Sequence, residues 1–499
     1  MSGFKFAAAW LASLVLFVPA LAQAQAQLRG GDVVTPDPAV RQGVLPNGLH
    51  YALVTNHTPS KSISIRLVMA VGSYDETDAE RGYAHFIEHM AFNGTAHIPS
   101  NRLDTVFGAE GVAFGRDQNA ETSYFTTLYM LDVPQLDAGK LDLAFTWLRD
   151  IADGEKLEAA AMDRERGVVL AEDDRSKGPE RDLAERLQKF LSPELRTTLR
   201  DPIGTRATVS AATPADLRAF YERWYRPEFA TVVVVGDLPT DELERRVTAA
   251  FSSWTGKGPA PARPRPSRPD LMRGFDVLTV TEPNLPSLTE VCFTHPDDEH
   301  GPDTVARMKR LAERSLWREV LNERLRALAE SDDPPFTKAV LEARESEHEA
   351  LYDCLATYPV GNDWGRALQA SLAEVRRLQA HGLGEAETGR ALGRLRASFR
   401  AASEGAATET NASAAQRFVA NLTQGDVVAS PHERFRILDR AIADTDEKTV
   451  SRAFQRDWAG GAGPLSCWSR PNRSRPRPCA RLGVRSPRGR RPRRSPITC

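Results

Sequence analysis

Apolar residues occupy every second position from Ile63 to Val71, a pattern typical of a strand with one buried face. Together with the residues before it, this run predicts two strands within residues 46–72. Residues 120–133, rich in Thr, Tyr and Phe, predict one strand that ends before Pro134. The remaining patterns predict strands over 229–235, 275–281 and 288–294, and helices over 80–93, 100–108 (with Ser100 as its cap), 136–153, 158–191, 239–253, 303–329 and 364–381.

Strands and helices are mixed along the chain without strict alternation, which favours an α+β fold. Residues 256–270 are rich in proline and read as a linker. After this linker the order of strands followed by helices begins again. The sequence therefore predicts two folded units, residues 36–255 and residues 271–463, although the repetition between them is too weak to see residue by residue.

The formal net charge of −2 hides an asymmetry along the chain. Residues 470–499 hold eleven arginines and no acidic residue, so the rest of the chain carries −13. An acidic body argues against nucleic acid as a partner. From residue 464 the composition turns abruptly to Arg, Pro and Ser, and we expect residues 464–499 to be disordered and outside any packed core. A shifted reading frame and a genuine basic tail for anionic surfaces both fit this composition.

The first 22 residues resemble a secretory signal peptide, with Lys5 preceding an apolar run from Phe6 to Val18. The small residues Ala20 and Ala22 fit a cleavage site, and two more sites of the same kind follow within four residues. The run of about 13 residues is shorter than the roughly 20 that span a bilayer, which favours cleavage over a membrane anchor. We therefore expect a periplasmic or secreted chain whose mature form has no transmembrane segment.

The five cysteines are unevenly placed. Export would permit disulfides, but the spacing does not resemble a disulfide framework. Cys292 and Cys354 stand alone in the body of the chain, and Cys292 lies within an apolar run. We expect Cys292 to be an ordinary core residue.

The strongest chemical signal is the run from His85 to His89, which has the pattern H-x-x-E-H. On a helix, positions i, i+3 and i+4 share one face, so both imidazoles can reach one metal ion with Glu88 beside them. A short motif can also arise by chance on a surface helix. Catalytic zinc sites generally use three protein ligands and leave a fourth position for water, so a further ligand is needed.

Two glutamates downstream, Glu165 and Glu172, are candidates for that role. They are seven residues apart, which is two helical turns, and so they share one face. In isolation, the pair would more readily be interpreted as a solvated face of a charged helix. The wider context of the chain decides between these interpretations.

Residues 81–95 resemble the zinc-helix signature of the pitrilysin/insulinase family of metallopeptidases, and in particular its bacterial periplasmic members. Residues 45–51 resemble that family's first strand, and residues 119–123 resemble its active-site edge strand. The resemblance extends over residues 36–463. It implies two tandem α/β-sandwich domains of similar fold, the first binding zinc and the second non-catalytic, which together form half of a clamshell.

The resemblance also assigns roles to individual residues. It implies that His85, His89 and Glu172 hold one Zn²⁺ per chain and that Glu165 orients a ligand from behind. It implies that Glu88 acts as general base toward a water on the zinc, as the physical chemistry of such sites allows. The activity implied is zinc-dependent endopeptidase cleavage of peptides or unfolded proteins.

In this family the substrate adds as a strand beside an enzyme strand, with main-chain hydrogen bonds supplying affinity. The resemblance implies that Asn119, Ala120 and Glu121 contribute to this binding. Where the family commonly carries an aromatic residue, this chain has Glu121. If its carboxylate lines a subsite, it would favour basic over apolar side chains of the substrate.

Members of this group are about twice as long as this chain, and their second half supplies an Arg and a Tyr that bind the substrate. No residue here can be assigned those two roles. An alternative function follows, that of a peptide-binding half without turnover of its own. Such a chain would need a homologous partner subunit or self-association to cleave peptides.

Overall fold

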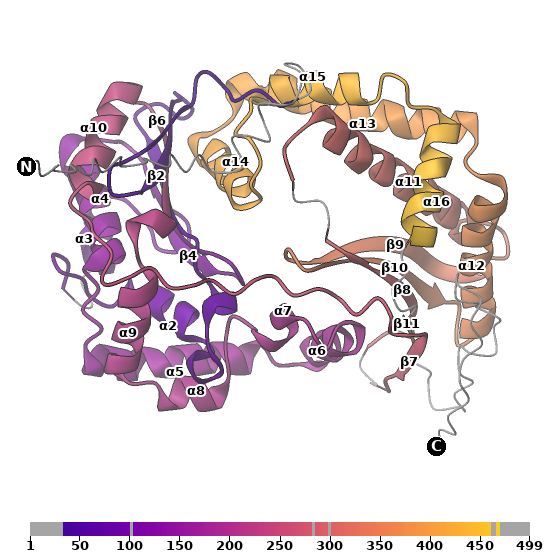
Figure 1. Ribbon diagram of the computed structural model, residues 1–499, viewed down its shortest axis with the longest axis horizontal. Helices are drawn as coiled ribbons and strands as arrows, with labels where there is room; N and C mark the ends of the chain where they lie inside the picture. Colours follow the sequence, from indigo (N-terminus) through magenta and orange to yellow (C-terminus); the bar gives the residue numbers. More distant parts are fainter. Residues whose placement is uncertain (1–32, 100–102, 282–284, 298–300, 461–465, 470–499) are drawn as a thin grey trace, which may run out of the picture.

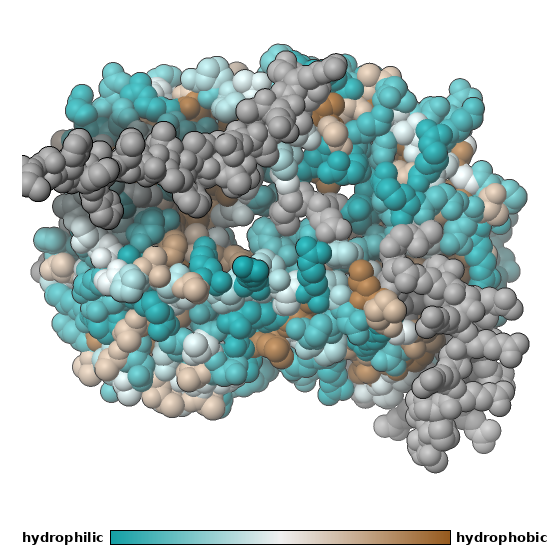
Figure 2. Space-filling model, viewed as in Figure 1, coloured by the Kyte–Doolittle hydropathy of each residue, from teal (hydrophilic) through white to brown (hydrophobic). Residues whose placement is uncertain are grey.

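The computed structural model describes residues 33–99, 103–281, 285–297, 301–460 and 466–469. Two mixed sheets, each covered by helices, form the two ends of the molecule (Figure 1). Polar residues cover most of the face seen in Figure 2, and the surface is hollowed between the two ends. The predicted signal peptide, the predicted cap Ser100 and residues 470–499 lie outside the described residues.

The first sheet has the strand order β1-β2-β6-β3-β5-β4. Its central strand β3 is buried at all seven positions, including Ser64 and Arg66, although the alternating pattern predicted one exposed face. The difference arises because a helix from the other end of the chain covers that face. The strands are β1 (Arg41–Val44), β2 (His50–Thr55), β3 (Ile63–Met69), β4 (Gln118–Thr122), β5 (Thr127–Val133) and β6 (Ala230–Gly236).

Helices cover the inner face of this sheet and share one apolar core with it. They are α2 (Tyr83–Met90), α3 (Leu103–Ala109), α4 (Ala138–Asp153), α5 (Ala159–Ser176), α8 (Arg206–Ala211), α9 (Pro214–Trp224) and α10 (Thr240–Phe251). The same part of the chain also forms α6 (Pro179–Leu191), α7 (Arg196–Leu199) and the short 3₁₀ turns η1 (Ser73–Asp75), η2 (Asp78–Glu80) and η3 (Pro227–Phe229).

Two predicted elements of this domain are each divided in the structure. The strand expected over 120–133 is a hairpin of β4 and β5, whose turn is closed by a hydrogen bond from the Ser123 amide to the Thr126 carbonyl (2.8 Å). The helix expected over 158–191 is broken between α5 and α6. Lys177 has extended backbone angles, and Pro179 begins the next helix. A proline disfavours helical backbone in the residue before it, here Gly178, which is extended and prevents one continuous helix.

The second sheet has the strand order β7-β11-β8-β10-β9. The hairpin of β9 and β10 and the four helices after α12 were not predicted. Its elements are β7 (Asp276–Thr279), β8 (Thr289–Pro296), α11 (Val305–Ala329), β9 (Phe336–Ser346), β10 (Ala350–Pro359), α12 (Trp364–His381), α13 (Glu385–Gly405), η4 (Ala406–Thr408), α14 (Asn411–Thr423), α15 (Pro431–Ala441), α16 (Glu447–Gly460) and β11 (Ser466–Ser469).

The strand β11 lies within the segment that was expected to stay outside any packed core from residue 464. It pairs in parallel with β7 and antiparallel with β8, so it sits inside the second sheet. The change in composition therefore begins before the second sheet is complete. The prediction failed here because four residues that complete a sheet carry too little pattern to stand out from a biased segment.

The two sheets share one topology. In the first, β2 runs parallel to β6, and β6, β3, β5 and β4 follow in antiparallel pairs. In the second, β7 runs parallel to β11, and β11, β8, β10 and β9 follow in the same way. The prediction of an α+β chain with two structurally similar domains is confirmed.

A helix of each domain packs against the sheet of the other domain. Ala414, Ala415 and Phe418 of α14 pack on the outer face of the first sheet, which includes Val68 and Val233. Figure 1 shows α14 reaching toward the first sheet and α6 lying beneath the second. The two sheets are therefore joined by reciprocal packing as well as by the chain that connects them.

The end of α6 and the residues after it complete this exchange. Leu191 and Leu195 pack against Cys292, Tyr352 and Cys354 of the second sheet. Cys292 and Cys354 lie opposite each other on β8 and β10 and form a disulfide with an S–S distance of 2.09 Å. The expectation that Cys292 is an ordinary core cysteine was wrong, because strand register brings together two residues that are 62 apart in sequence.

The residues expected to form a linker, 256–270, have no regular secondary structure but are anchored to both domains. Arg263 pairs with Asp75 at 3.1 Å, and the Ser267 amide donates to Glu349 at 2.7 Å. Among the described residues, no helix is both long and apolar enough to cross a membrane.

Candidate metal centre

The helix α2 has two chemically different faces. Phe86, Ile87 and Met90 are buried in the core of the first domain, while His85 and His89 lie toward a cleft on the other side. This division follows from the helical period, since positions three and four apart share a face. The prediction of a helix with both histidines on one face is confirmed.

The N-terminus of α2 is capped by a residue from outside the helix. Glu76 is fully buried, and its carboxylate accepts hydrogen bonds from the amides of Gly82 and Ala84, both at 2.9 Å. Gly82 itself has a φ of +92°, which glycine adopts without strain. A carboxylate at a helix N-terminus also complements the helix dipole, so Glu76 fixes where the helix carrying the histidines begins.

Three donor atoms meet at the cleft from two helices. The Nε2 atoms of His85 and His89 are 3.2 Å apart. The Oε2 atom of Glu172, on α5, lies 3.7 Å from the first and 3.3 Å from the second. A tetrahedral zinc with bonds of about 2.0–2.2 Å separates its ligand atoms by roughly 3.3–3.6 Å. The three donors therefore fit one zinc ion.

The orientation of His89 is held from behind. Its Nδ1 lies 2.7 Å from Oε1 of Glu165, whose other oxygen accepts a hydrogen bond from Asn93 at 2.8 Å. Such a carboxylate behind an imidazole is the usual way of fixing a metal-binding histidine. In the part of the chain that the structure describes, the buried Nδ1 of His85 has no hydrogen-bond partner. The two histidines are thus supported unequally.

The donors also differ in exposure. The side chains of His85, His89 and Glu165 are 11%, 17% and 15% exposed, whereas that of Glu172 is 46% exposed. Three of these groups are set into the protein, and Glu172 alone faces solvent. A cation would therefore reach the cluster from the side of α5.

The electrostatics separate the two histidines. Burial, reinforced by the neighbouring His89, lowers the pKa of His85 to about 4, so this ring is neutral and able to bind metal. Burial also lowers the pKa of His89, but its hydrogen bonds with Glu165 and Glu172 outweigh this and raise the pKa to about 9. The hydrogen bond with His89 lowers the pKa of Glu172. The cluster is thus rich in negative charge around His89, as a cation site requires.

Glu88 lies beside the donors and is tied to the neighbouring sheet. Its Oε2 accepts a hydrogen bond from the Thr122 hydroxyl at 2.7 Å, which links α2 to β4. Burial raises the pKa of Glu88 to about 7, although the bond from Thr122 acts in the opposite direction. A carboxyl group with a pKa near neutrality can both accept and return a proton.

The cleft beside the donors has a volume of about 840 Å³ and is bounded on one side by β4. This strand lies at the end of the sheet and pairs with β5 alone among the described strands. Asn119, Ala120 and Glu121 all line the cleft, and the first and last of them are exposed. All eight predicted site residues are therefore gathered around one cleft.

Several residues of this site were not anticipated from the sequence. Glu76, Asn93 and Thr122 each hold a predicted residue or its helix. Glu76 lies in a loop and Thr122 on another element, β4, so sequence spacing does not connect either of them to α2. Phe114 and Val168 form an exposed apolar rim on the cleft. A signal for Asn93 did exist, because it follows His89 by one helical turn.

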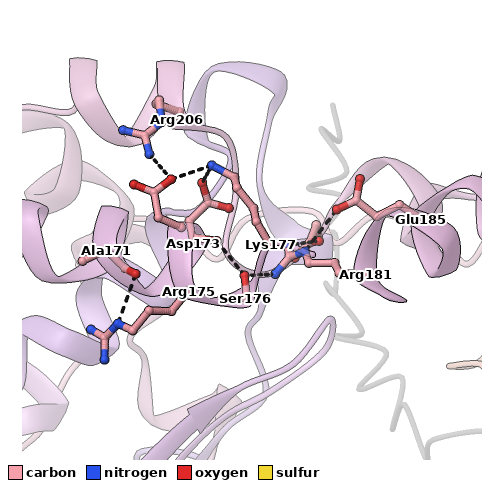
Figure 3. A network of polar contacts seen from close by, with 10 residues as sticks. Ala171, Asp173, Arg175, Ser176, Lys177, Arg181, Glu185 and Arg206 are labelled. Carbon is pink, nitrogen blue, oxygen red and sulfur yellow. Dashed lines mark hydrogen bonds and ion pairs between the residues drawn. The ribbon is translucent and has the colours of Figure 1, made fainter. Parts of the chain in front are cut away.

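Ion pairs hold the break between α5 and α6, just beyond the carboxylate donor (Figure 3). Lys177 pairs with Asp173 at 2.8 Å and with Asp174 at 2.7 Å, and Arg206 joins Asp174 at 2.6 Å. Arg181 extends the network into α6. Single exposed pairs stabilise a protein little, but these converge on the last turn of α5 and restrict its position.

Two family descriptions match consecutive parts of the chain. Residues 51–193 match Insulinase (Peptidase family M16), and residues 211–323 match the Peptidase M16 inactive domain.

The chain belongs to the insulinase family, peptidase family M16. It is similar to the probable zinc protease PqqL of Escherichia coli (strain K12), with 33% identity over 240 residues. That match covers 48% of this chain and 26% of the relative, so the matched segment spans about a quarter of the relative's length.

Solved structures show the same fold for this M16 chain. The first half of the periplasmic protease PqqL from Escherichia coli superposes with a TM-score of 0.82 at 24% identity, covering 88% of this chain and 93% of that one. The whole of that protease gives a TM-score of 0.81 at 24% identity, and the match covers 48% of its chain. The described domains therefore have the fold of the first half of that protease.

Proposed function

We propose that this M16 chain is a zinc-dependent metalloendopeptidase. The observation that carries the proposal is the set of donor distances between His85, His89 and Glu172, with Glu88 beside them at an open cleft. Such a constellation combines a cation site, a proton acceptor and room for an extended chain. The relatives described as zinc proteases support the same reaction.

In this proposal each group has a distinct task. Zinc, when bound, supplies a water acidic enough to lose a proton near pH 7 and polarises the substrate carbonyl. Glu88 accepts the proton of the attacking water and returns it to the leaving amine. Glu165 and Asn93 keep the His89 ring in its orientation. Thr122 keeps the carboxylate of Glu88 turned toward the cleft.

The substrate is bound as an extra strand on the free edge of β4. Asn119, Ala120 and Glu121 present that edge to the cleft, and main-chain hydrogen bonds there would accept peptides of varied sequence. An unfolded protein or a peptide is the substrate class that can adopt such a strand. We further propose that the chain acts in the periplasm or outside the cell, which agrees with its disulfide and with the periplasmic relative.

The decisive experiment replaces the proton acceptor and leaves the metal donors intact. Glu88→Gln should retain one zinc per chain by metal analysis and lose about 10²–10⁴-fold in cleavage of a mixed fluorogenic peptide library. Glu158→Gln, at the exposed start of α5, is the matched control and should cleave normally. Undiminished cleavage by the Glu88 variant would show that the mechanism is wrong.

A second candidate function is favoured by how much of the solved protease this chain matches. The match covers 48% of that chain, so this chain has the fold of about half of it. The protein could then bind zinc and peptide yet need a homologous partner for turnover. Purified chain that binds zinc and peptide but cleaves only when a similar-sized chain co-purifies would support this alternative. Chelator-sensitive cleavage by the chain alone would exclude it.

A further inference from the structure

The turns of the two equivalent hairpins meet between the domains. In the first domain the turn between β4 and β5 carries Phe125, and in the second the turn between β9 and β10 carries His348. The two rings make an edge contact, with centroids 4.9 Å apart and planes at 79°. A part of the second domain therefore touches the hairpin that borders the cleft.

The residue after His348 anchors this contact. Glu349 is 1% exposed, and its carboxylate accepts a hydrogen bond from the Tyr74 hydroxyl at 2.6 Å. It also accepts bonds from the amide and hydroxyl of Thr197, at 3.0 and 2.7 Å, and from the amide and hydroxyl of Ser267. One carboxylate of the second domain thus holds η1, α7 and the linker together.

Tyr74 connects Glu349 to the hairpin of β4 and β5. Its ring stacks on Phe125 with centroids 4.5 Å apart, and its amide donates to the Tyr124 carbonyl at 2.8 Å. At Gly72 there is no room for a side chain, because a Cβ would lie 2.4 Å from the Ser123 carbonyl oxygen. The turn between β4 and β5 therefore lies directly on the backbone around η1.

The strand β4 depends on this turn more than an interior strand would. It has five residues and pairs with β5 on one side, while its other edge lines the cleft. Local stability follows the number of contacts that hold a segment. Gln118, at the start of β4, bridges to Phe114. From Asn119 onward, the position of β4 is set by β5, by the bond between Thr122 and Glu88, and by the turn at its end.

We propose that Glu349 is a positioning residue for the substrate strand, which it holds through Tyr74 and Phe125. The inference rests on the proposed function in one respect, namely that β4 is the strand to which substrate adds. It gives the second domain, which contributes no group to the metal cluster, a part in substrate binding. Glu349 acts on where β4 lies and leaves the metal donors untouched.

The test replaces one oxygen of this carboxylate. In Glu349→Gln the amide nitrogen must face either the Thr197 amide or the Ser267 amide, so either Thr197 loses its acceptor or Ser267 keeps only the Tyr74 hydroxyl. We expect hydrogen exchange of residues 118–126 to accelerate about fivefold, the effect of one lost hydrogen bond, while exchange in α2 and the zinc content stay unchanged. For a peptide substrate we expect KM to rise by a similar factor and kcat to stay the same.

The matched control is Glu342→Gln on β9, whose carboxylate bonds Arg344 within the second domain. It should alter neither exchange in 118–126 nor KM. Unchanged exchange in 118–126 of a folded Glu349 variant would overturn the proposal, as would a parallel loss of zinc. Because exchange needs no turnover, this result is independent of whether the chain is a peptidase.

A second variant serves if Glu349→Gln does not fold. Tyr74→Phe removes the hydroxyl, which bonds Glu349, the Ser267 amide and the Arg265 carbonyl, and keeps the ring on Phe125. It should produce the same acceleration in residues 118–126 and the same rise in KM. Wild-type exchange in Tyr74→Phe would overturn the proposal equally.

Discussion

Apart from β1, which extends the first sheet, the two domains have the same strand order but place different helices between equivalent strands. Between β3 and β4, the first domain has two short helices, α3 and the eight-residue α2, and the outward face of α2 carries His85, Glu88 and His89. Between β8 and β9, the second has the 25-residue α11, which buries Leu316 and Trp317 against its sheet and has no histidine. A repeated topology thus supports a metal cluster at one end of the molecule and plain packing at the other.

The two domains also differ in the partners of their acidic side chains. In the second domain, Glu290 pairs with Arg344 at 2.6 Å and Asp353 pairs with Arg318 at 2.7 Å. Glu290 also lies near two cysteines, but these are joined in the disulfide. In the first domain, by contrast, the acids around the cluster pair with the histidines themselves: Glu165 with His89, and Glu172 with both His85 and His89. The comparison teaches that a metal site needs carboxylates left free of cations, which the fold alone does not provide.

We expect the largest effect on zinc binding and cleavage from removing one of the metal donors, which only the first domain has. Glu172→Gln takes away the donor on α5 and should lower zinc affinity by more than about a hundredfold and cleavage by about a thousandfold or more. Competition with a chromophoric chelator measures the first and peptide turnover the second. Glu158→Gln on the same helix should change neither. Normal zinc affinity in the Glu172 variant would mean that another residue is the third zinc ligand.

A second experiment breaks the reciprocal cover between the domains. Phe418→Ala opens a cavity between α14 and the first sheet and should cost about 3–5 kcal/mol of unfolding free energy. Urea unfolding measures the loss, and hydrogen exchange should show that β3 and β6 are the strands affected. Phe435→Ala, on α15 and away from that sheet, is the control. Equal effects of the two substitutions would contradict the special role of α14.

The disulfide distinguishes the second sheet from the first. Cys292→Ser with Cys354→Ser should lower stability by about 2–4 kcal/mol, because the bridge restricts the unfolded chain. The loss should appear as a lower Tm, and reductant should have no further effect on the variant. Zinc binding at the first domain should be retained. Loss of zinc would mean that the second sheet supports α5 through α6 more strongly than we infer.

The smallest effect concerns the edge strand of the cleft. Glu121→Phe replaces an exposed carboxylate by the aromatic residue common in the family. The preference for Lys over Phe in otherwise identical peptides should fall about fivefold, as an exposed ion pair contributes little. Comparing kcat/KM for the two peptides measures it, with Glu110→Gln as a control outside the cleft. An unchanged preference would remove Glu121 from the specificity site.

The parts predicted from the sequence were those encoded within one element. His85, Glu88 and His89 lie on one helical face, so their spacing alone brings them together. Glu165 and Glu172 needed the family resemblance as well, because their partners lie on another helix. The position of β3 followed from alternation, but its exposure did not, because α14 covers it from far along the chain. The strand β1 (Arg41–Val44) was not predicted, and β4 and β5 were predicted as one strand.

The missed features depend on contacts between distant segments. Glu76 reaches α2 through a loop, and no periodicity links a loop carboxylate to a helix amide. Cys292 and Cys354 pair because β8 and β10 align in one register, which neither strand reveals separately. The helices after α12 were missed in a stretch rich in alanine and arginine, where the apolar stripe is narrow.

The helix lent by the second domain has a consequence for the order in which the protein is made. The first sheet is complete once β6 has been synthesised, yet its outer face, with Val68 and Val233, is covered only when residues 411–423 follow. Many proteins fold domain by domain as the chain emerges. If the N-terminal domain folded first, this apolar face would be exposed and could associate with other chains. Binding to a chaperone, or translocation across a membrane before folding, would therefore suit its biogenesis better than early folding.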